Sequence, residues 1–135
     1  MGDIDYAATL TNAASHSCTL YGYPGLLLLD AKYAPLPTDA LRIPDPAKRL
    51  IILPAGGIAT AFGRFTPDVP GVGDNTTVPP GGVWVCQPTA VHIQIIPPDE
   101  TTHLVVKVTP PTSVCQSGLM QVSAFAPGAK WPPRP

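Results

Sequence analysis

The sequence predicts an all-β protein: an antiparallel, immunoglobulin-like β-sandwich of about seven strands, with a small β-barrel as the alternative. Three observations favour this class. The 135 residues are enough for one domain and too few for two ordinary ones. The chain has 19 prolines and 12 glycines, which argues against helices because an interior proline costs a helix about 3 kcal/mol. Hydrophobic residues make up 44% of the chain, and they recur at every second position rather than at helical spacing.

The first half of the chain contains four predicted strands. Residues 4–11 alternate between apolar residues and polar or small ones, the pattern of a half-buried strand. Residues 26–30 are a short, mostly apolar run, which predicts a strand covered on both faces. Residues 50–53 and 58–65 predict two further strands, joined by a hairpin-like connection at Pro54-Ala55-Gly56-Gly57.

The second half contains a predicted hairpin and a last strand. Residues 91–95 alternate strictly, and a turn at residues 97–102 leads into a second alternating strand. In that second strand, residues 104–108, we expect the even-numbered side chains to face inward. Pro110-Pro111 is expected to end it, and residues 120–124 mark the last strand.

Three stretches carry no strand pattern. Residues 31–48 contain four prolines and leave room for an irregular crossing with one helical turn. Residues 66–83 are rich in proline and glycine and predict a long loop, which is where we expect function to lie, because such loops are commonly functional. We therefore divide the chain into one sandwich domain, residues 1–126, and a proline-rich mobile tail, residues 127–135.

The charge balance excludes two classes of partner. Only 13% of the residues are charged and the net charge is −1, so the chain has no basic surface for nucleic acid or for an anionic membrane. The longest apolar run, residues 26–29, is far shorter than the roughly 20 residues of a transmembrane helix. We expect no transmembrane segment in this chain and no cofactor.

Residues suited to catalysis or metal binding are few. The chain has no G-x-S-x-G elbow. If Ile96 pairs with His103, then His92 lies opposite Lys107. His92 and His103 then both point out of the core, and no third residue follows at the spacing of a metal site. The other candidates considered were His16 beside Cys18, for nucleophilic catalysis, and Asp68, Asp74 and Asn75, for calcium without the EF-hand spacing. We expect no catalytic residue and no metal site.

The three cysteines, Cys18, Cys86 and Cys115, are widely spaced and include no CxxC pair, which argues against zinc. Their odd number leaves two alternatives from the residues alone. Either one disulfide forms and one thiol stays free, or all three are buried thiols that pack as small hydrophobic side chains.

Several short motifs resemble a family of secreted and lipoprotein domains of unknown function that is common in actinobacteria. The motifs are Leu10-Thr11-Asn12, the CTLYGYPG stretch from Cys18 to Gly25, Leu53-Pro54-Ala55-Gly56-Gly57, Cys86-Gln87-Pro88-Thr89, Pro97-Pro98-Asp99-Glu100-Thr101 and Val114-Cys115. The resemblance covers roughly residues 6–125. It implies an exported, cell-envelope location and an immunoglobulin-like sandwich, and it implies no catalytic residues.

The resemblance also bears on the cysteines. Relatives usually begin one strand earlier and carry a fourth cysteine there, a segment that we do not find in this chain. We therefore expect that Cys18 pairs with Cys86 and that Cys115 has lost its partner, with Cys18–Cys115 as the competing pairing.

The sequence indicates an interaction patch rather than an active site. Tyr21 and Tyr23 alternate around Gly22 at a predicted corner, where they pack or stack on a ligand, and Trp84 follows the long loop. We expect an exported envelope module that binds an envelope protein or a glycan. The alternatives are a purely structural lipoprotein domain and, less in keeping with the residues, a metal-binding or hydrolytic enzyme.

Overall fold

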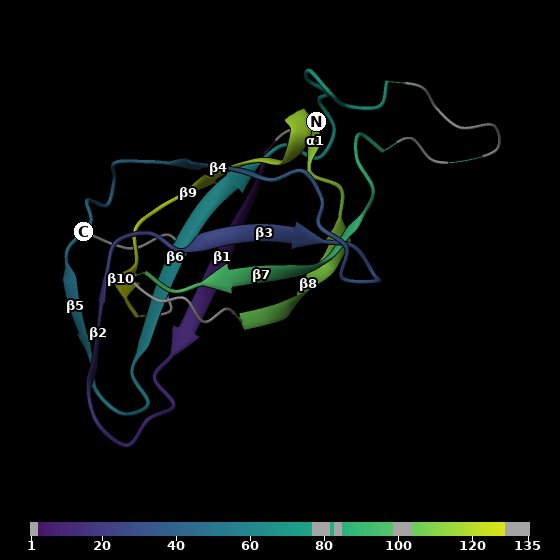
Figure 1. Cartoon of the computed structure of the whole chain (residues 1–135). Helices are drawn as coiled ribbons and strands as arrows, with labels where there is room; N and C mark the ends of the chain where they lie inside the picture. Colours follow the sequence, from purple (N-terminus) through teal and green to yellow (C-terminus); the bar gives the residue numbers. More distant parts are fainter. Residues whose placement is uncertain (1–2, 77–81, 83–84, 99–103, 129–135) are drawn as a thin grey trace.

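The computed structural model describes residues 3–76, 82, 85–98 and 104–128, and it confirms the prediction of an all-β sandwich (Figure 1). The elements in chain order are β1 (Ile4–Thr11), β2 (Cys18–Tyr21), β3 (Gly25–Leu29), β4 (Asp39–Arg42), β5 (Leu50–Leu53), β6 (Ile58–Phe65), β7 (Ala90–Ile96), β8 (Leu104–Thr112), α1 (Cys115–Gly118), β9 (Leu119–Val122) and β10 (Ala126–Pro127). The strands form several sheets, and no closed barrel is present among the described residues.

Two main sheets build the sandwich. One has the strand order β1-β6-β9-β4, with β10 paired to β6, and the other has the order β3-β7-β8. In Figure 1 the β3-β7-β8 sheet lies across β1 and β6. A small third sheet, β2-β5, completes the fold. All neighbouring strands are antiparallel except β4 and β9.

Two apolar clusters hold the layers together. The first joins the β2-β5 sheet to β6 and consists of Leu20, Ile51, Leu53, Ala59, Ala61 and Phe125. The second lies between the two main sheets and consists of Leu28, Ala90, Val114 and Met120, with Tyr6, Phe65 and Ile93 packed against it. Burial of this apolar surface is the main favourable contribution to folding.

The strands at 4–11, 50–53 and 58–65 form as predicted, but the last two are not a hairpin. Instead β5 pairs with β2, and β6 pairs with β1. The side chain of Asn12 explains the crossing, because its amide donates to the carbonyls of Leu53 and Pro54, while its backbone N–H and C=O bond to Gly57 and Gly56. These bonds let the chain change sheets at the turn.

Two proline-rich stretches also differ from the prediction. Residues 39–42, expected in an irregular crossing, form the edge strand β4, which pairs with β9 from the far end of the chain. Such a strand has no local pattern because only Ala40 is partly buried in it. Strand β8 continues through Pro110-Pro111 to Thr112, because a strand that is paired on one side only tolerates residues without an N–H.

The β7–β8 hairpin forms as predicted, with His92 opposite Lys107. At the C-terminus, β10 pairs with β6, and the Gly128 N–H donates to the Ile58 carbonyl. Residues 129–135 of the predicted tail lie outside the described residues. No helix within the described ranges has the length and apolar character needed to cross a membrane.

The disulfide prediction was wrong. Cys86 is bonded to Cys115, and Cys18 is the free cysteine. Both bonded residues are buried, at 1% and 0% exposure, and their Cα atoms are 5.1 Å apart, within the usual range for a disulfide. Cys18 cannot reach either of them because it lies on β2, opposite Leu53, and packs against the other apolar cluster.

Candidate functional site: an apolar cleft between two edge strands

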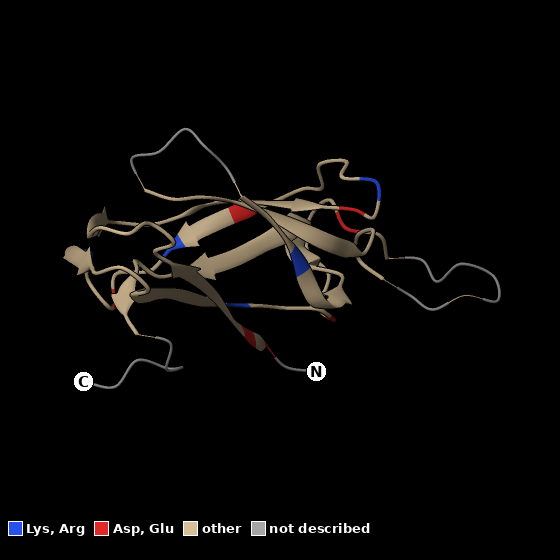
Figure 2. Ribbon diagram, turned by 90° about the horizontal axis from the view of Figure 1, so that it is seen from below, with Lys and Arg blue, Asp and Glu red and all other residues tan. Residues whose placement is uncertain are grey.

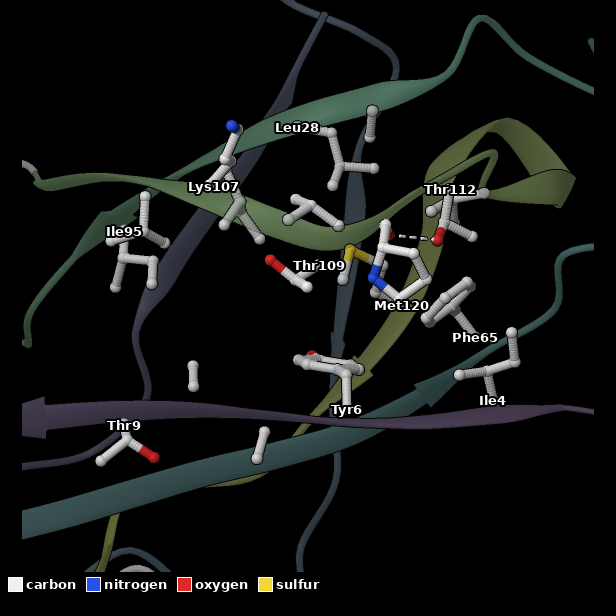
Figure 3. Close-up of a pocket in the computed structure, with 18 of the residues that line it drawn as sticks. Ile4, Tyr6, Thr9, Leu28, Phe65, Ile95, Lys107, Thr109, Thr112 and Met120 are labelled. Atoms are coloured by element: carbon white, nitrogen blue, oxygen red, sulfur yellow. Dashed lines mark hydrogen bonds between the residues drawn. The ribbon is translucent and has the colours of Figure 1, made fainter.

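A cleft of about 670 Å³ opens between β1 and the β7–β8 hairpin (Figure 3). Its volume is within the range of small-molecule binding sites, roughly 300–1,000 Å³. The apolar side chains that line it come from all parts of the sandwich: Ile4, Leu10, Leu28, Phe65, Ile93, Ile95, Leu104, Val106, Val108, Val114 and Met120. The cleft is thus a continuation of the apolar cluster between the main sheets, open to solvent at one side.

Strand β1 forms one wall. Its even-numbered residues face the interior of the sandwich, since Tyr6 packs on the cluster between the sheets and Leu10 packs on the other cluster. Yet these residues are only half-buried or exposed, and Ile4 is the most exposed of them. An inward face that stays half-exposed indicates that the sheet opposite does not cover it.

Strand β8 forms the other wall. Leu104 and Val106 face inward as predicted, and both line the cleft. They are nevertheless 46% and 44% exposed, because nothing among the described residues packs over them. Figure 3 shows Thr109 of β8 and Tyr6 of β1 pointing toward one another across the space.

Tyr6 closes the inner end of the cleft. Its hydroxyl donates to the Gln121 carbonyl at 2.5 Å, and its ring lies 6.3 Å from that of Phe65. Burial raises the pKa of Tyr6 far above its usual value, so the phenol stays neutral at physiological pH. Its hydroxyl proton is donated to the Gln121 carbonyl, and its ring shapes the inner end of the cleft.

Gly63 makes this arrangement fit. It lies opposite Tyr6 on β6, and a Cβ atom at this position would lie 1.7 Å from the Gln121 carbonyl oxygen and 2.8 Å from the Tyr6 ring. A glycine inside a strand is a sequence signal of such a close approach.

Two of the residues that line the cleft are charged, Asp5 and Lys107, but their charged groups lie on outer faces. Asp5 alternates with Tyr6, so its carboxylate lies on the outer face, where it accepts a hydrogen bond from Arg64 Nε at 2.8 Å. Lys107 also lies on an outer face, opposite His92, and Figure 3 shows its ammonium pointing away from Tyr6. Over the whole described chain, the charged residues are scattered along the ribbon (Figure 2). Because both charged groups point away from it, the inner surface of the cleft is mainly apolar.

The predicted interaction patch lies elsewhere. Tyr21 is exposed on β2 opposite Leu50, with the Lys48 ammonium 5.6 Å from its ring centre. The Tyr23 hydroxyl donates to the Ile43 carbonyl at 2.8 Å. Neither tyrosine lines the cleft, and Trp84 lies outside the described residues. A ligand-binding role of Tyr21 and Tyr23 stays a prediction.

Asp74, one of the residues considered for calcium binding, bonds to backbone and side-chain N–H groups of the protein. The Asp74 carboxylate accepts hydrogen bonds from the Gln87 side chain and from the backbone N–H groups of Gly71, Gln116 and Ser117. Although burial alone would raise it, these bonds hold the pKa of Asp74 below its ordinary value. Asp74 also lies close to the sulfurs of Cys86 and Cys115, but disulfide sulfurs are not the thiolate ligands that metals bind.

The same bonds stabilise an unusual turn. Gln116 and Ser117 both have positive φ, at 58° and 55°, a conformation that is costly for residues with a Cβ. Two of the N–H groups bound by Asp74 belong to these residues. Asp74 therefore acts as an internal anion that holds the chain around Cys115.

His92 is likewise part of the packing. Its ring stacks on Tyr33 at 4.1 Å, and its Nδ1 lies 3.2 Å from the Asp30 carbonyl oxygen. His103 lies outside the described residues.

Comparison with known proteins identifies one family. No curated protein and no solved structure matches the chain. One family model matches residues 1–126, which is nearly the whole chain. The chain therefore belongs to the family described as domain of unknown function DUF4232.

Proposed function

We propose that this protein is an exported module of the cell envelope that binds the apolar part of a partner in the cleft between β1 and β8. The cleft carries the proposal, because a sandwich of this size normally closes the space between its sheets with its own side chains. A domain that acts only as a spacer has no need of such an opening, and the exposed apolar residues would favour aggregation. Binding explains why they are exposed.

The disulfide supports the exported location. Cys86 and Cys115 form a bond that persists in an oxidising compartment and is rare in the cytosol. The actinobacterial envelope proteins that the CTLYGYPG motif resembles fit the same location. Cell fractionation tests this part: we expect the protein in the envelope or outside the cell with Cys86 and Cys115 oxidised, and a reduced cytoplasmic protein would contradict it.

The binding role is tested with an uncharged, apolar fluorescent probe, Nile red, on two matched variants. Val106→Lys places an ammonium group in the cleft, whereas Val105→Lys places it on the neighbouring residue, which does not line the cleft. The two valines are 44% and 42% exposed, so both variants should fold equally well.

We expect saturable binding of the probe to the wild type and to Val105→Lys, and an affinity at least about tenfold lower for Val106→Lys, because the lysine has to be desolvated when the probe binds. Thermal unfolding of both variants checks that each is folded. Equal probe binding by the two variants would show that the cleft is not the binding site.

A further inference from the structure

We propose that the occupant of the cleft is a β-strand of a partner protein, which pairs with the free edge of β1 and inserts every second side chain between the sheets. The inference rests on the proposed function, and it adds the chemical class of the partner and its binding geometry.

Both the backbone and the side chains of β1 border the cleft. A strand that contributed only one face would line a cavity with alternate residues. All eight residues of β1 line this one, including Asp5, whose side chain is held on the outer face by Arg64. On β8 the consecutive residues 106–110 line it as well. The cleft is therefore a slot between two strand edges.

The edge of β1 is open to pairing. Among the described residues β1 pairs with β6 alone, so its second edge carries unpaired N–H and C=O groups. Proteins commonly protect such edges with proline, bulges or lysine. The edge of β8 has Pro110-Pro111 and Lys107. Strand β1 has no proline, bulge or lysine over its eight paired residues, and its one charged side chain, Asp5, is bonded to Arg64 on the neighbouring strand. Strand addition is therefore expected at β1.

The side-chain space matches an added strand. A strand that pairs along the whole of β1 is about 26 Å long and directs about four side chains inward. They would lie beside Ile4, Tyr6, Ala8 and Leu10, at the distance of cross-strand pairs. Because Ala8 is small and the inner surface of the cleft is mainly apolar, apolar residues such as valine, leucine or isoleucine fit at these positions.

The charge at the beginning of β1 adds a second requirement. Asp3 and Asp5 lie together there, and Arg64 is the one cation described beside them. Asp3 is bound by the uncharged hydroxyl of Thr66. A partner strand with a lysine or arginine on its outward face at this end would balance the excess negative charge.

These observations favour a polypeptide over a lipid and over a second copy of the chain. An acyl chain would fill the space but leave the backbone groups of the β1 edge without partners, which is unfavourable once water is excluded. A second copy that paired through its own β1 would bring no cation to Asp3 and Asp5, because β1 contains no lysine or arginine.

The test uses synthetic peptides of nine residues with valine at every second position, threonine between, and lysine at both ends. Binding is measured by calorimetry, and the β1 amides are followed by NMR. Two further peptides carry backbone N-methyl groups, one on the residues of one edge and the other on the residues of the opposite edge. The methyl groups remove hydrogen bonds on one side only, so each peptide is a control for the other.

We expect the unmodified peptide to bind the protein one-to-one. One methylated peptide should bind at least about tenfold more weakly than the other, and the unmodified peptide should bind the Val106→Lys protein at least about tenfold more weakly than the Val105→Lys protein. Replacing the lysines by glutamate should weaken binding at least about threefold. Equal loss with both methylated peptides would overturn the strand-pairing geometry, and equal binding of the lysine and glutamate peptides would overturn the charge requirement.

The remaining outcomes separate this inference from the proposed function. If the dye binds in the cleft and no peptide does, the inference fails and the proposed function stands. Displacement of the dye by decanoate but not by peptide would identify a lipid site. If no peptide binds, and if the protein dimerises in sedimentation experiments but the Ala7→Pro variant does not, the occupant is a second copy of the chain. If neither dye nor peptide binds, both proposals fail.

Discussion

Removal of the Cys86–Cys115 disulfide should destabilise the protein strongly. The bond joins residues 29 positions apart, and the chain-entropy relation gives about 3.6 kcal/mol of stabilisation at 25 °C for a loop of this length. Both sulfurs are fully buried, so replacement by alanine also removes some packing. For a domain of this size a loss of this magnitude lowers the midpoint of thermal unfolding by about 10–15 °C.

The assay compares the double variant Cys86→Ala/Cys115→Ala with Cys18→Ala by differential scanning calorimetry, with and without a reductant. Cys18 is a half-buried free thiol, so its replacement should lower the free energy of unfolding by about 1 kcal/mol or less. The reductant should lower the midpoint of the wild type and of Cys18→Ala by similar amounts and leave the double variant unchanged.

One result would refute this reasoning. If Cys18→Ala alone abolished the effect of the reductant, Cys18 would be part of the disulfide and the connectivity would be wrong. Peptide mapping without reduction gives the same answer independently, since the expected cross-linked fragment contains Cys86 and Cys115 and the alkylated fragment contains Cys18.

Three further predictions concern the turn around Cys115 and the inner end of the cleft. Asp74→Ala should cost roughly 2–3 kcal/mol of unfolding free energy at pH 7, because four N–H donors lose an anionic acceptor. The pKa of Asp74 is lower in the folded protein than in the unfolded chain, so Asp74 stabilises the fold when the pH is above the ordinary aspartate pKa, and this stabilisation is lost as the pH falls. Chemical denaturation should therefore show that the difference in unfolding free energy between Asp74→Ala and wild type shrinks below about pH 4. Gly63→Ala should cost about 3 kcal/mol or more, because the Cβ would overlap the Gln121 carbonyl, and a thermal midpoint near that of wild type would contradict this packing. Tyr6→Phe should cost about 1 kcal/mol, the value of its hydrogen bond to Gln121, without loss of probe binding in the cleft.

The fold was predictable where the pattern is local. The alternation in residues 4–11 and 91–95 identifies β1 and β7, because side chains on a strand alternate between core and solvent whatever the partner strand is. Pairing between distant segments was not predictable. Asp39–Arg42 becomes a strand only because β9 supplies hydrogen bonds from about 80 residues away along the chain.

The site was harder to predict from the sequence than the fold. The disulfide depends on how the chain brings residue 86 to residue 115, and cysteine spacing does not encode that distance. The cleft depends on which strand edges stay unpaired, which is a property of topology. The residue types of Tyr21 and Tyr23 indicate a binding patch, yet the exposed apolar surface of the cleft includes Leu104 and Val106, two ordinary aliphatic residues of β8.

The contrast between β1 and its neighbour β6 gives the strongest reason to regard the sandwich as open at this side. Both strands have eight residues and pair over their whole length. In β6, Ala59 and Ala61 are completely buried, whereas no residue of β1 is. Both strands lie in one sheet, so the difference arises at the free edge of β1, where the second sheet leaves the inward side chains uncovered. An added strand there would bury the inward face of β1 as thoroughly as that of β6, and hydrogen-exchange protection of the β1 amides on peptide binding would measure that change directly.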